Sequence, residues 1–297
     1  MANVSGESYT NDVGIENSWV KTVRMIVKDR APLLKILETS KATQFLHQWQ
    51  YDSVAKPSSN NASIEAAETT TAAPADLTNG LNWCQIVKTA YAVSGTQVAT
   101  NYNGIKDYLA YQRKKAMKKN GLDFEYALEV GTGLVGDATT AREVKGLSTW
   151  CTGQNSTTAT TTTFNTSAGE EALNSVLQAI YEDGEEANTV ILSPANKKKV
   201  SNWTNSNTKY QDRSEKKLMN LISVYESDFG TVEFYISTMI GDANVCVFDR
   251  EALKIAYLRP TFSQDLAITG DFVPFQIITE GTLEVLNPDA TGAVVIS

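Results

Sequence analysis

The sequence predicts an α+β protein that carries extended appendages around a globular body. Three observations support this: a polar and then amphipathic N-terminal segment, an unusually long helical pattern near the middle, and a second half in which helical and strand patterns alternate. With 297 residues, of which 42% are hydrophobic and 20% charged, the chain can bury a sizeable core and is not of the disordered class.

The N-terminal segment, residues 1–41, has too few apolar residues to form a core of its own. Ile15, Trp19 and Val23 recur at helical spacing before Pro32 interrupts the pattern. We therefore expect an arm that packs on something else.

A projecting hairpin is predicted next. From residue 43 to residue 51 the apolar period changes to two, which indicates a strand. Residues 53–83 are polar and cannot build a core, and a strand pattern returns at 87–93. Two strands flanking a long polar stretch predict a hairpin of a kind that a partner usually orders. The residues that share one face of the first strand are Phe45, His47, Trp49 and Tyr51.

Residues 101–130 carry the strongest helical pattern. A helix of this length would span about 45 Å, which is longer than most globular helices. The Gly- and Thr-rich stretch from Gly131 to Thr163 is interpreted as surface loops. The apolar stripe of the helix comprises Ile105, Leu109, Gln112 and Ala116.

A basic cluster lies on this helix, although the chain has a net charge of −8. On a helical wheel Lys114 and Lys118 lie opposite the apolar stripe, and Lys115 flanks them. Two hypotheses fit the cluster equally well: contact with nucleic-acid phosphates, or a helix face that is solvated or paired with a neighbouring subunit. The cluster comprises Arg113, Lys114, Lys115, Lys118 and Lys119.

The second half of the chain alternates helix and strand patterns and ends in β-rich sequence. Ser193-Pro194 supplies an N-cap and a first-turn proline for one helix. The predicted elements are a helix at 172–181, a buried strand at 190–192, a hairpin over 224–235, a central strand at 245–248 and further strands between 252 and 296.

The chain offers little for catalysis. Its single histidine, His47, lies between aromatic neighbours and is expected to pack or to form a hydrogen bond. Cys84, Cys151 and Cys246 form no CxxC pair and suit a reducing compartment as free thiols. We therefore predict no metal site, no cofactor and no enzymatic activity, and we recognise neither a secretory signal nor a membrane span.

One phosphate-loop pattern, GxGxxG, runs from Gly131 to Gly136. Such a loop binds a dinucleotide only between a strand and a helix N-terminus. Here a long helix precedes it and no second βαβ half follows, so coincidence is the preferred explanation. A nucleotide-binding enzyme is kept as an alternative.

An arm, a projecting hairpin, a very long helix, an α/β lobe and terminal strands together describe a subunit that builds a shell. The chain also resembles the major capsid proteins of tailed bacteriophages with the Hong Kong 97-type fold, in segments spread in order over almost its whole length. The matching segments are His47-Gln48-Trp49 with Asp52, 82–87 (NWCQIV), 93–96 (VSGT), 225–230 (YESDFG), 258–260 (LRP), 269–271 (TGD) and 280–285 (EGTLEV) with Asn287.

The resemblance implies a division of the chain. It comprises an N-terminal arm (1–41), an extended-loop hairpin (42–98, with its tip at 53–83), a spine helix with the peripheral domain (99–139), an axial domain (140–258) and returning peripheral strands (259–297). The spine helix would run along the inner side of the shell, so that Arg113, Lys114, Lys115 and Lys118 look at packaged DNA. We also expect at least one of Trp19, Trp49 and Trp83 to lie at a contact between subunits.

The resemblance further implies self-assembly into hexamers and pentamers of an icosahedral head around double-stranded DNA, in the host cytoplasm, with no membrane. A portal protein and possible scaffold or minor capsid proteins would be partners. Because no coiled-coil segment lies ahead of the arm after Met1, a separate scaffold, or none, is expected. Lys56 is the one lysine of the loop tip and lies near its base, so no covalent cross-link is expected. An encapsulin-type bacterial compartment shell is the alternative within this fold.

Overall fold

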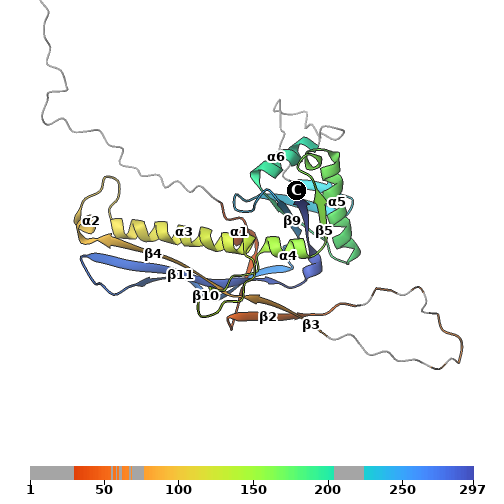
Figure 1. Ribbon diagram of the computed structural model, residues 1–297, viewed down its shortest axis with the longest axis horizontal. Helices are drawn as coiled ribbons and strands as arrows, with labels where there is room; N and C mark the ends of the chain where they lie inside the picture. The colour runs from red at the N-terminus through yellow and green to blue at the C-terminus, as the bar shows by residue number, and fades with distance from the viewer. Residues whose placement is uncertain are drawn as a thin grey trace, which may run out of the picture.

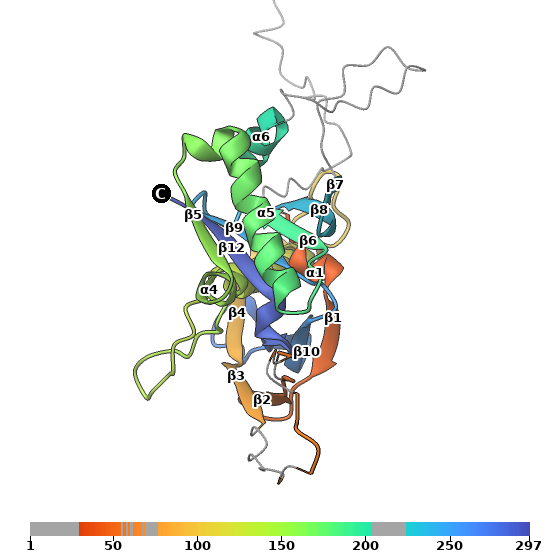
Figure 2. The same ribbon diagram turned by 90° about the vertical axis from the view of Figure 1, so that its right-hand side faces the viewer.

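The computed structural model describes residues 30–54, 56–57, 59, 62–66, 68, 77–203 and 224–297. Within these ranges the strands form a four-stranded, a six-stranded and a two-stranded sheet. A long helix, α3 (Tyr108–Val130), runs along the four-stranded sheet, and the six-stranded sheet with its helices stands near the end of α3 (Figure 1). The two-stranded sheet projects beyond the body, and Figure 2 shows it at the end of the molecule away from the six-stranded sheet.

The four-stranded sheet has the order β1–β10–β11–β4, with β1 parallel to β10 and the other neighbours antiparallel. Register shifts lie on both sides of Arg259 in the long β10–β11 ladder, next to Pro260, which has no N–H to donate. The strands are β1 (Glu38–Lys41), β4 (Gln85–Ser94), β10 (Leu253–Asp265) and β11 (Phe272–Val285).

Helix α3 covers one face of this sheet. It begins after Asp107, whose side chain accepts a hydrogen bond from the Ala110 amide at 2.9 Å. Ala116 packs against Phe275 and Ile277 of β11. The helix has 23 residues and so spans about 35 Å.

The helix is shorter than the sequence predicted. Ile105, the first member of the expected stripe, lies ahead of the N-cap and forms an isolated β-bridge with Tyr102. The spacing of Ile105 fits a helix. However, Asp107 is the N-cap and its side chain satisfies a first-turn amide, so the helix begins only at Tyr108. Leu109 and Ala116 have the predicted role, because both pack on the sheet.

The six-stranded sheet has the order β5–β12–β9–β6–β8–β7 and is covered by helices on both faces. In β9, Cys246 and Phe248 pack in the same cluster as α4, whereas Val245 and Val247 pack in the cluster that contains α5 and α6. Burial on both faces explains the continuous apolar run of this strand. The elements are β5 (Ser156–Ala159), β6 (Thr189–Leu192), β7 (Val224–Ser227), β8 (Gly230–Ile236), β9 (Asn244–Phe248), β12 (Thr291–Ile296), α4 (Leu147–Gly153), α5 (Ser167–Glu182) and α6 (Pro194–Trp203).

Most predictions for this lobe are confirmed, including the strands at 190–192 and 245–248 and the hairpin over 224–235. The interpretation of 131–163 as surface loops is wrong, because α4 lies there with Leu147 and Cys151 fully buried. The last strand of the segment 259–297, β12, lies in this six-stranded sheet between β5 and β9, whereas β11 lies in the four-stranded sheet.

The projecting sheet pairs β2 (Leu46–Tyr51) with β3 (Thr78–Trp83) and not with the strand pattern at 87–93. That pattern is β4, which pairs with β11. Strand β3 falls in the stretch that was expected to be the tip. The sequence did not predict this strand, because Asn79 and Gly80 have little β propensity. The strand forms there because the Trp49 ring packs on Gly80, where a Cβ would overlap the indole.

One hydrophobic cluster joins the two larger sheets. Phe124 and Leu128 of α3 share it with Leu253 of β10, Phe248 of β9 and Leu147 of α4. The two lobes therefore have a continuous core at the C-terminal end of α3. The short elements are α1 (Leu33–Ile36), α2 (Gly95–Ala99) and the 3-10 turns η2 (Thr163–Asn165) and η3 (Pro288–Ala290).

Gly121 on α3 provides a test of how helix propensity limits stability. A Cβ at this position would meet no atom within 4 Å. Gly121→Ala should therefore raise the free energy of unfolding by about 0.5–1 kcal/mol, measured by urea unfolding of dissociated subunits. Gly281→Ala is the matched control, because its Cβ would lie 2.9 Å from the Ala256 carbonyl oxygen and from Phe124 Cζ. Equal effects of the two substitutions would contradict this account of α3.

Candidate subunit and genome interfaces

Asn82 anchors the projecting hairpin to the body. Its Nδ2 donates hydrogen bonds to the carbonyl oxygens of Leu283 at 2.8 Å and Lys145 at 3.0 Å. Its Oδ1 accepts hydrogen bonds from the amides of Trp83 and Lys145, both at 2.8 Å. The residue is 1% exposed and uses both ends of its amide, so the base of β3 is fixed to β11 and to the loop before α4.

The inner face of the hairpin packs on the body. Trp49 is buried, and its ring centroid lies 6.2 Å from that of Trp150. The His47 Nε2 lies 3.3 Å from a carboxylate oxygen of Glu284 on β11, and its ring lies 5.7 Å from Trp49. His47 thus has the packing role that the sequence predicted.

The outer face of the hairpin exposes apolar side chains near its base, whereas Gln48, Gln50 and Asn79 occupy the rest of that face. Leu81 of β3 is 45% exposed and Phe45, just before β2, is 50% exposed. Trp83 is partly buried and stacks on Phe45 with a centroid distance of 5.9 Å. Of the three tryptophans predicted to contact other subunits, Trp83 alone among those described lies on an open face, and Trp19 lies outside the described residues.

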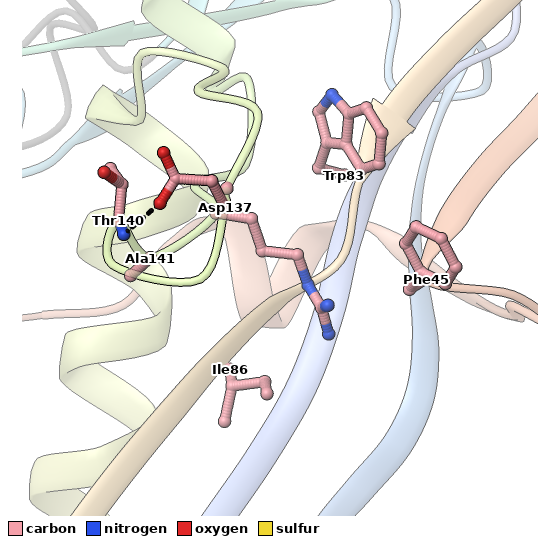
Figure 3. A pocket seen from close by; sticks show the side chains of 8 residues that line it. Phe45, Trp83, Ile86, Asp137, Thr140 and Ala141 are labelled. Carbon is pink, nitrogen blue, oxygen red and sulfur yellow. Dashed lines mark hydrogen bonds between the residues drawn. The ribbon is translucent and has the colours of Figure 1, made fainter.

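A pocket of about 320 Å³ opens at the base of this face. Figure 3 shows Phe45, Trp83 and Ile86 on one side and the turn with Asp137 and Thr140 on the other. Its lining is mainly apolar, with one acidic and one basic side chain. The lining residues are Phe45, Trp83, Ile86, Gly136, Asp137, Thr140, Ala141 and Arg142.

Arg142 fixes one wall of the pocket. Its Nε donates to the Cys84 carbonyl oxygen at 2.5 Å, and its guanidinium lies over the Phe45 ring at 5.6 Å. It also pairs with Glu280, which is buried and accepts a second hydrogen bond from Arg259 Nε at 2.6 Å. One buried carboxylate between two guanidinium groups holds this wall rigid.

The opposite wall is a turn held by Asp137. The amides of Thr139 and Thr140 both donate to its carboxylate at 2.7 Å. These hydrogen bonds lower the pKa of the Asp137 carboxyl to about 2, so the group is charged at neutral pH.

The basic cluster on α3 divides into two parts. Arg113 is tied to the sheet, because its Nη2 lies 2.5 Å from Asp265 Oδ1 and its guanidinium lies over the Phe275 ring. Lys119 pairs with Asp123 one turn along the helix.

The other three lysines, Lys114, Lys115 and Lys118, are exposed. No carboxylate of the described residues lies within ion-pair distance of any of them. They form an unpaired basic strip on the side of α3 away from the sheet, which we call the lysine strip. Arg113 is not part of it.

The GxGxxG segment has no geometry for a nucleotide. Gly131 is the C-cap of α3, so the segment follows the carbonyl end of a helix. The Gly133 amide donates to the Val144 carbonyl oxygen at 3.1 Å, and Leu134 accepts from the Glu143 amide at 2.9 Å. These backbone groups face a neighbouring strand of chain and are not free to bind phosphate.

The three cysteines and Lys56 were also singled out by the sequence. Cys84, Cys151 and Cys246 are buried and free, and burial raises the pKa of the Cys84 thiol to about 11. Lys56 lies 3.3 Å from Asp183 of its own chain. In the described ranges no group of three or more metal-ligating side chains occurs, and none of the helices there is long and apolar enough to cross a membrane.

A protein-family model, the SU10 major capsid protein, matches residues 3–296. The chain belongs to this family. Solved structures share its fold: the capsid of a native GTA particle (14% identity, 99% of each chain, TM-score 0.70), Microbacterium phage Oxtober96 (11%, 95% of this chain and 96% of that one, 0.66) and the capsid of Myoviridae phage XM1 (10%, 95% and 97%, 0.62). A search of the curated proteins found no match.

Family and fold agree with the sequence-based prediction. The chain has the Hong Kong 97-type α+β fold and is a major capsid protein of the tailed-phage type. The family implies a structural role in the virion, and the matching structures lend no support to the encapsulin alternative. The outer hairpin face, the pocket and the lysine strip are thus surfaces of a shell subunit.

Removal of the Asn82 amide should loosen the hairpin. Asn82→Ala leaves buried carbonyl and amide groups of Leu283 and Lys145 without partners. We expect the free energy of unfolding to fall by about 2–4 kcal/mol, measured by urea unfolding of dissociated subunits. Asn79→Ala, on an exposed position of the same strand, should cost less than about 0.5 kcal/mol. Similar losses for both variants would show that the Asn82 contacts are not the anchor.

Proposed function

We propose that this capsid protein forms hexamers and pentamers of an icosahedral head through the outer face of its β2–β3 hairpin and the pocket at the hairpin base. The observation that carries this proposal is an exposed apolar patch, with Phe45, Leu81 and Trp83, near the base of a sheet of only two strands. Such a sheet is marginal by itself, and a cluster of exposed apolar side chains marks a surface that binds another protein. In a self-assembling family the occupant is a second copy of the chain.

Trp83 is the proposed anchor of this contact. It is half-buried by its own subunit, stacks on Phe45 and has the pocket beside it (Figure 3). Large aromatic side chains beside a rigid cavity supply most of the binding energy at protein interfaces. Each contact needs to contribute only a few kcal/mol, because closure of a symmetric shell multiplies it.

A charge placed on the hairpin face tests the contact. Leu81→Lys should leave the subunit folded, because the side chain is 45% exposed, but it should prevent shell formation. Electron microscopy and sedimentation would measure assembly, and circular dichroism would check the fold. Leu81→Met keeps an apolar group of similar size and is the matched control. Normal shells from Leu81→Lys would reject this face as a subunit contact.

We further propose that the four-stranded sheet with α3 is the peripheral domain and the six-stranded sheet with its helices the axial domain. Residues 1–41 would form the N-terminal arm, whose last part, β1, joins the edge of the four-stranded sheet, and the hairpin within 42–98 would form the extended loop. Assembly would take place in the host cytoplasm with a portal protein and, where the phage encodes them, scaffold or minor capsid proteins.

The lysine strip is proposed to meet the packaged genome. Lys114 and Lys118 lie one turn apart, have no partner among the described carboxylates and belong to a chain of net charge −8. Evenly spaced cations of this kind bind phosphates without reading sequence, and the contact weakens with salt. This suits a subunit of which many copies meet arbitrary DNA.

A double charge reversal decides between genome contact and the alternatives. Lys114→Glu with Lys118→Glu should give shells of normal shape that retain DNA poorly, measured by nuclease protection across a salt series. The matched control, Lys88→Glu with Lys198→Glu, makes the same change in net charge at exposed lysines elsewhere, and Lys88 points away from α3. If the first variant fails to assemble, the lysine strip is instead a contact between subunits. If it packages DNA fully, the lysine strip is only a solvated helix face.

A further inference from the structure

Two glutamates on α3 have no place in the interfaces above. Glu125 and Glu129 lie one helical turn apart, and each has no exposed surface. Neither forms an ion pair within the described parts of the chain. Buried carboxyl groups without a counterion are rare, because loss of hydration penalises the charged form.

Glu125 holds the first helix of the described chain. Its Oε1 accepts a hydrogen bond from the Leu33 amide at 2.6 Å, and its Oε2 accepts one from the Leu34 amide at 2.9 Å. Helix α1 begins after Pro32, which supplies no side-chain cap. A carboxylate from α3, more than ninety residues away in sequence, therefore caps α1.

Glu129 reaches the other lobe. Its Oε2 accepts a hydrogen bond from Ser237 Oγ at 2.6 Å, just after β8, and the Ile240 amide also donates to this carboxyl. Its Oε1 has no hydrogen-bond partner among the described residues, and the Glu125 carboxyl neighbours the Glu129 carboxyl. The two carboxyl groups thus connect α1, α3 and the segment between β8 and β9.

Few other charged or titratable groups face the pair. Lys35 of α1 and Tyr257 of β10 lie near Glu125, and the thiols of Cys246 on β9 and Cys151 on α4 lie on the Glu129 side. Burial raises the pKa of Glu125, although the Leu33 and Leu34 amides oppose this. Burial and then the Glu125 charge raise the pKa of Glu129 to about 8.

We propose that Glu125 and Glu129 hold one proton between them and form a pH-sensitive clamp that keeps α1 docked on α3. With the proton, Glu129 is a neutral acid beside the Glu125 carboxylate, which accepts the two amides of α1. Without it, two negative charges face each other in a site that water does not reach, and they repel.

The contact that yields is the one to α1. Helix α1 has only four residues, so once the contact to the Glu125 carboxylate is lost, little besides the burial of Leu33 in the shared core holds it on α3. Residues 1–29 precede α1 in the sequence, so opening the clamp would detach the start of the described chain from α3.

The sign of the pH dependence follows from the raised pKa values. A docked-state pKa above the ordinary 4.5 means that docking takes up a proton. The clamp is therefore fully formed at acidic pH and is lost as pH rises through about 8, where Glu129 gives up the proton.

Hydrogen–deuterium exchange of the full-length protein tests the clamp without reference to assembly. We expect the protection of the Leu33 and Leu34 amides, corrected for intrinsic exchange, to fall about tenfold or more from about pH 6 to about pH 8. Glu129→Gln keeps a neutral group that can donate to Glu125, so its protection should change less than about twofold over this range. Asp123→Asn, on the exposed side of the same helix, is the matched control and should behave like the wild type.

Protection that does not change with pH in the wild type, or that falls equally in Glu129→Gln, would overturn the proposal. If Glu129→Gln does not fold, infrared spectroscopy of the wild type in heavy water replaces it. A buried carboxylic-acid band should be present at about pH 6, where exposed carboxyls are ionised, and should disappear by about pH 9. Absence of that band at about pH 6 would equally overturn the clamp.

Discussion

Burial of the C-terminal half of α3 from several sides is the constraint on which the rest of the subunit depends. Phe124 and Leu128 lie in a core shared by both large sheets, whereas Ala116 in the N-terminal half touches only the four-stranded sheet. One helix thus has a half that joins the lobes and a half that is open on its far side. The lysine strip is on the open half and the buried glutamates are on the joined half.

Local patterns were sufficient where an element is buried in a regular way. The strands at 190–192 and 245–248 have continuous apolar sequence, which follows from their burial on both faces. The pattern failed where tertiary contacts decide the structure. Helix α4 lies in a Gly- and Thr-rich stretch and has seven residues, which are too few to form a stable helix alone. It forms because Leu147 and Cys151 are buried against the sheet.

The candidate surfaces were predictable to a similar degree. The exposure of Lys114 and Lys118 follows from helical geometry, so a helical wheel drawn from the sequence predicts it. Arg113 is one residue away, but its ion pair with Asp265 depends on where β10 ends, which no local pattern reveals. The pair Glu125 and Glu129 has the spacing of an ordinary solvated helix face, and only the packing of α1 and the β8–β9 segment against it makes it buried.

The buried polar contacts have a common feature that explains why a shell subunit would keep them. Asn82 to Leu283, Glu125 to Leu33 and Glu129 to Ser237 each join segments far apart in the sequence, with separations of 201, 92 and 108 residues. Apolar packing tolerates small slides between lobes, whereas a buried hydrogen bond is lost if its partners shift. A closed shell repeats every angular error of its subunit around each symmetry axis, so directional contacts at the lobe and hairpin junctions fix the angles on which closure depends.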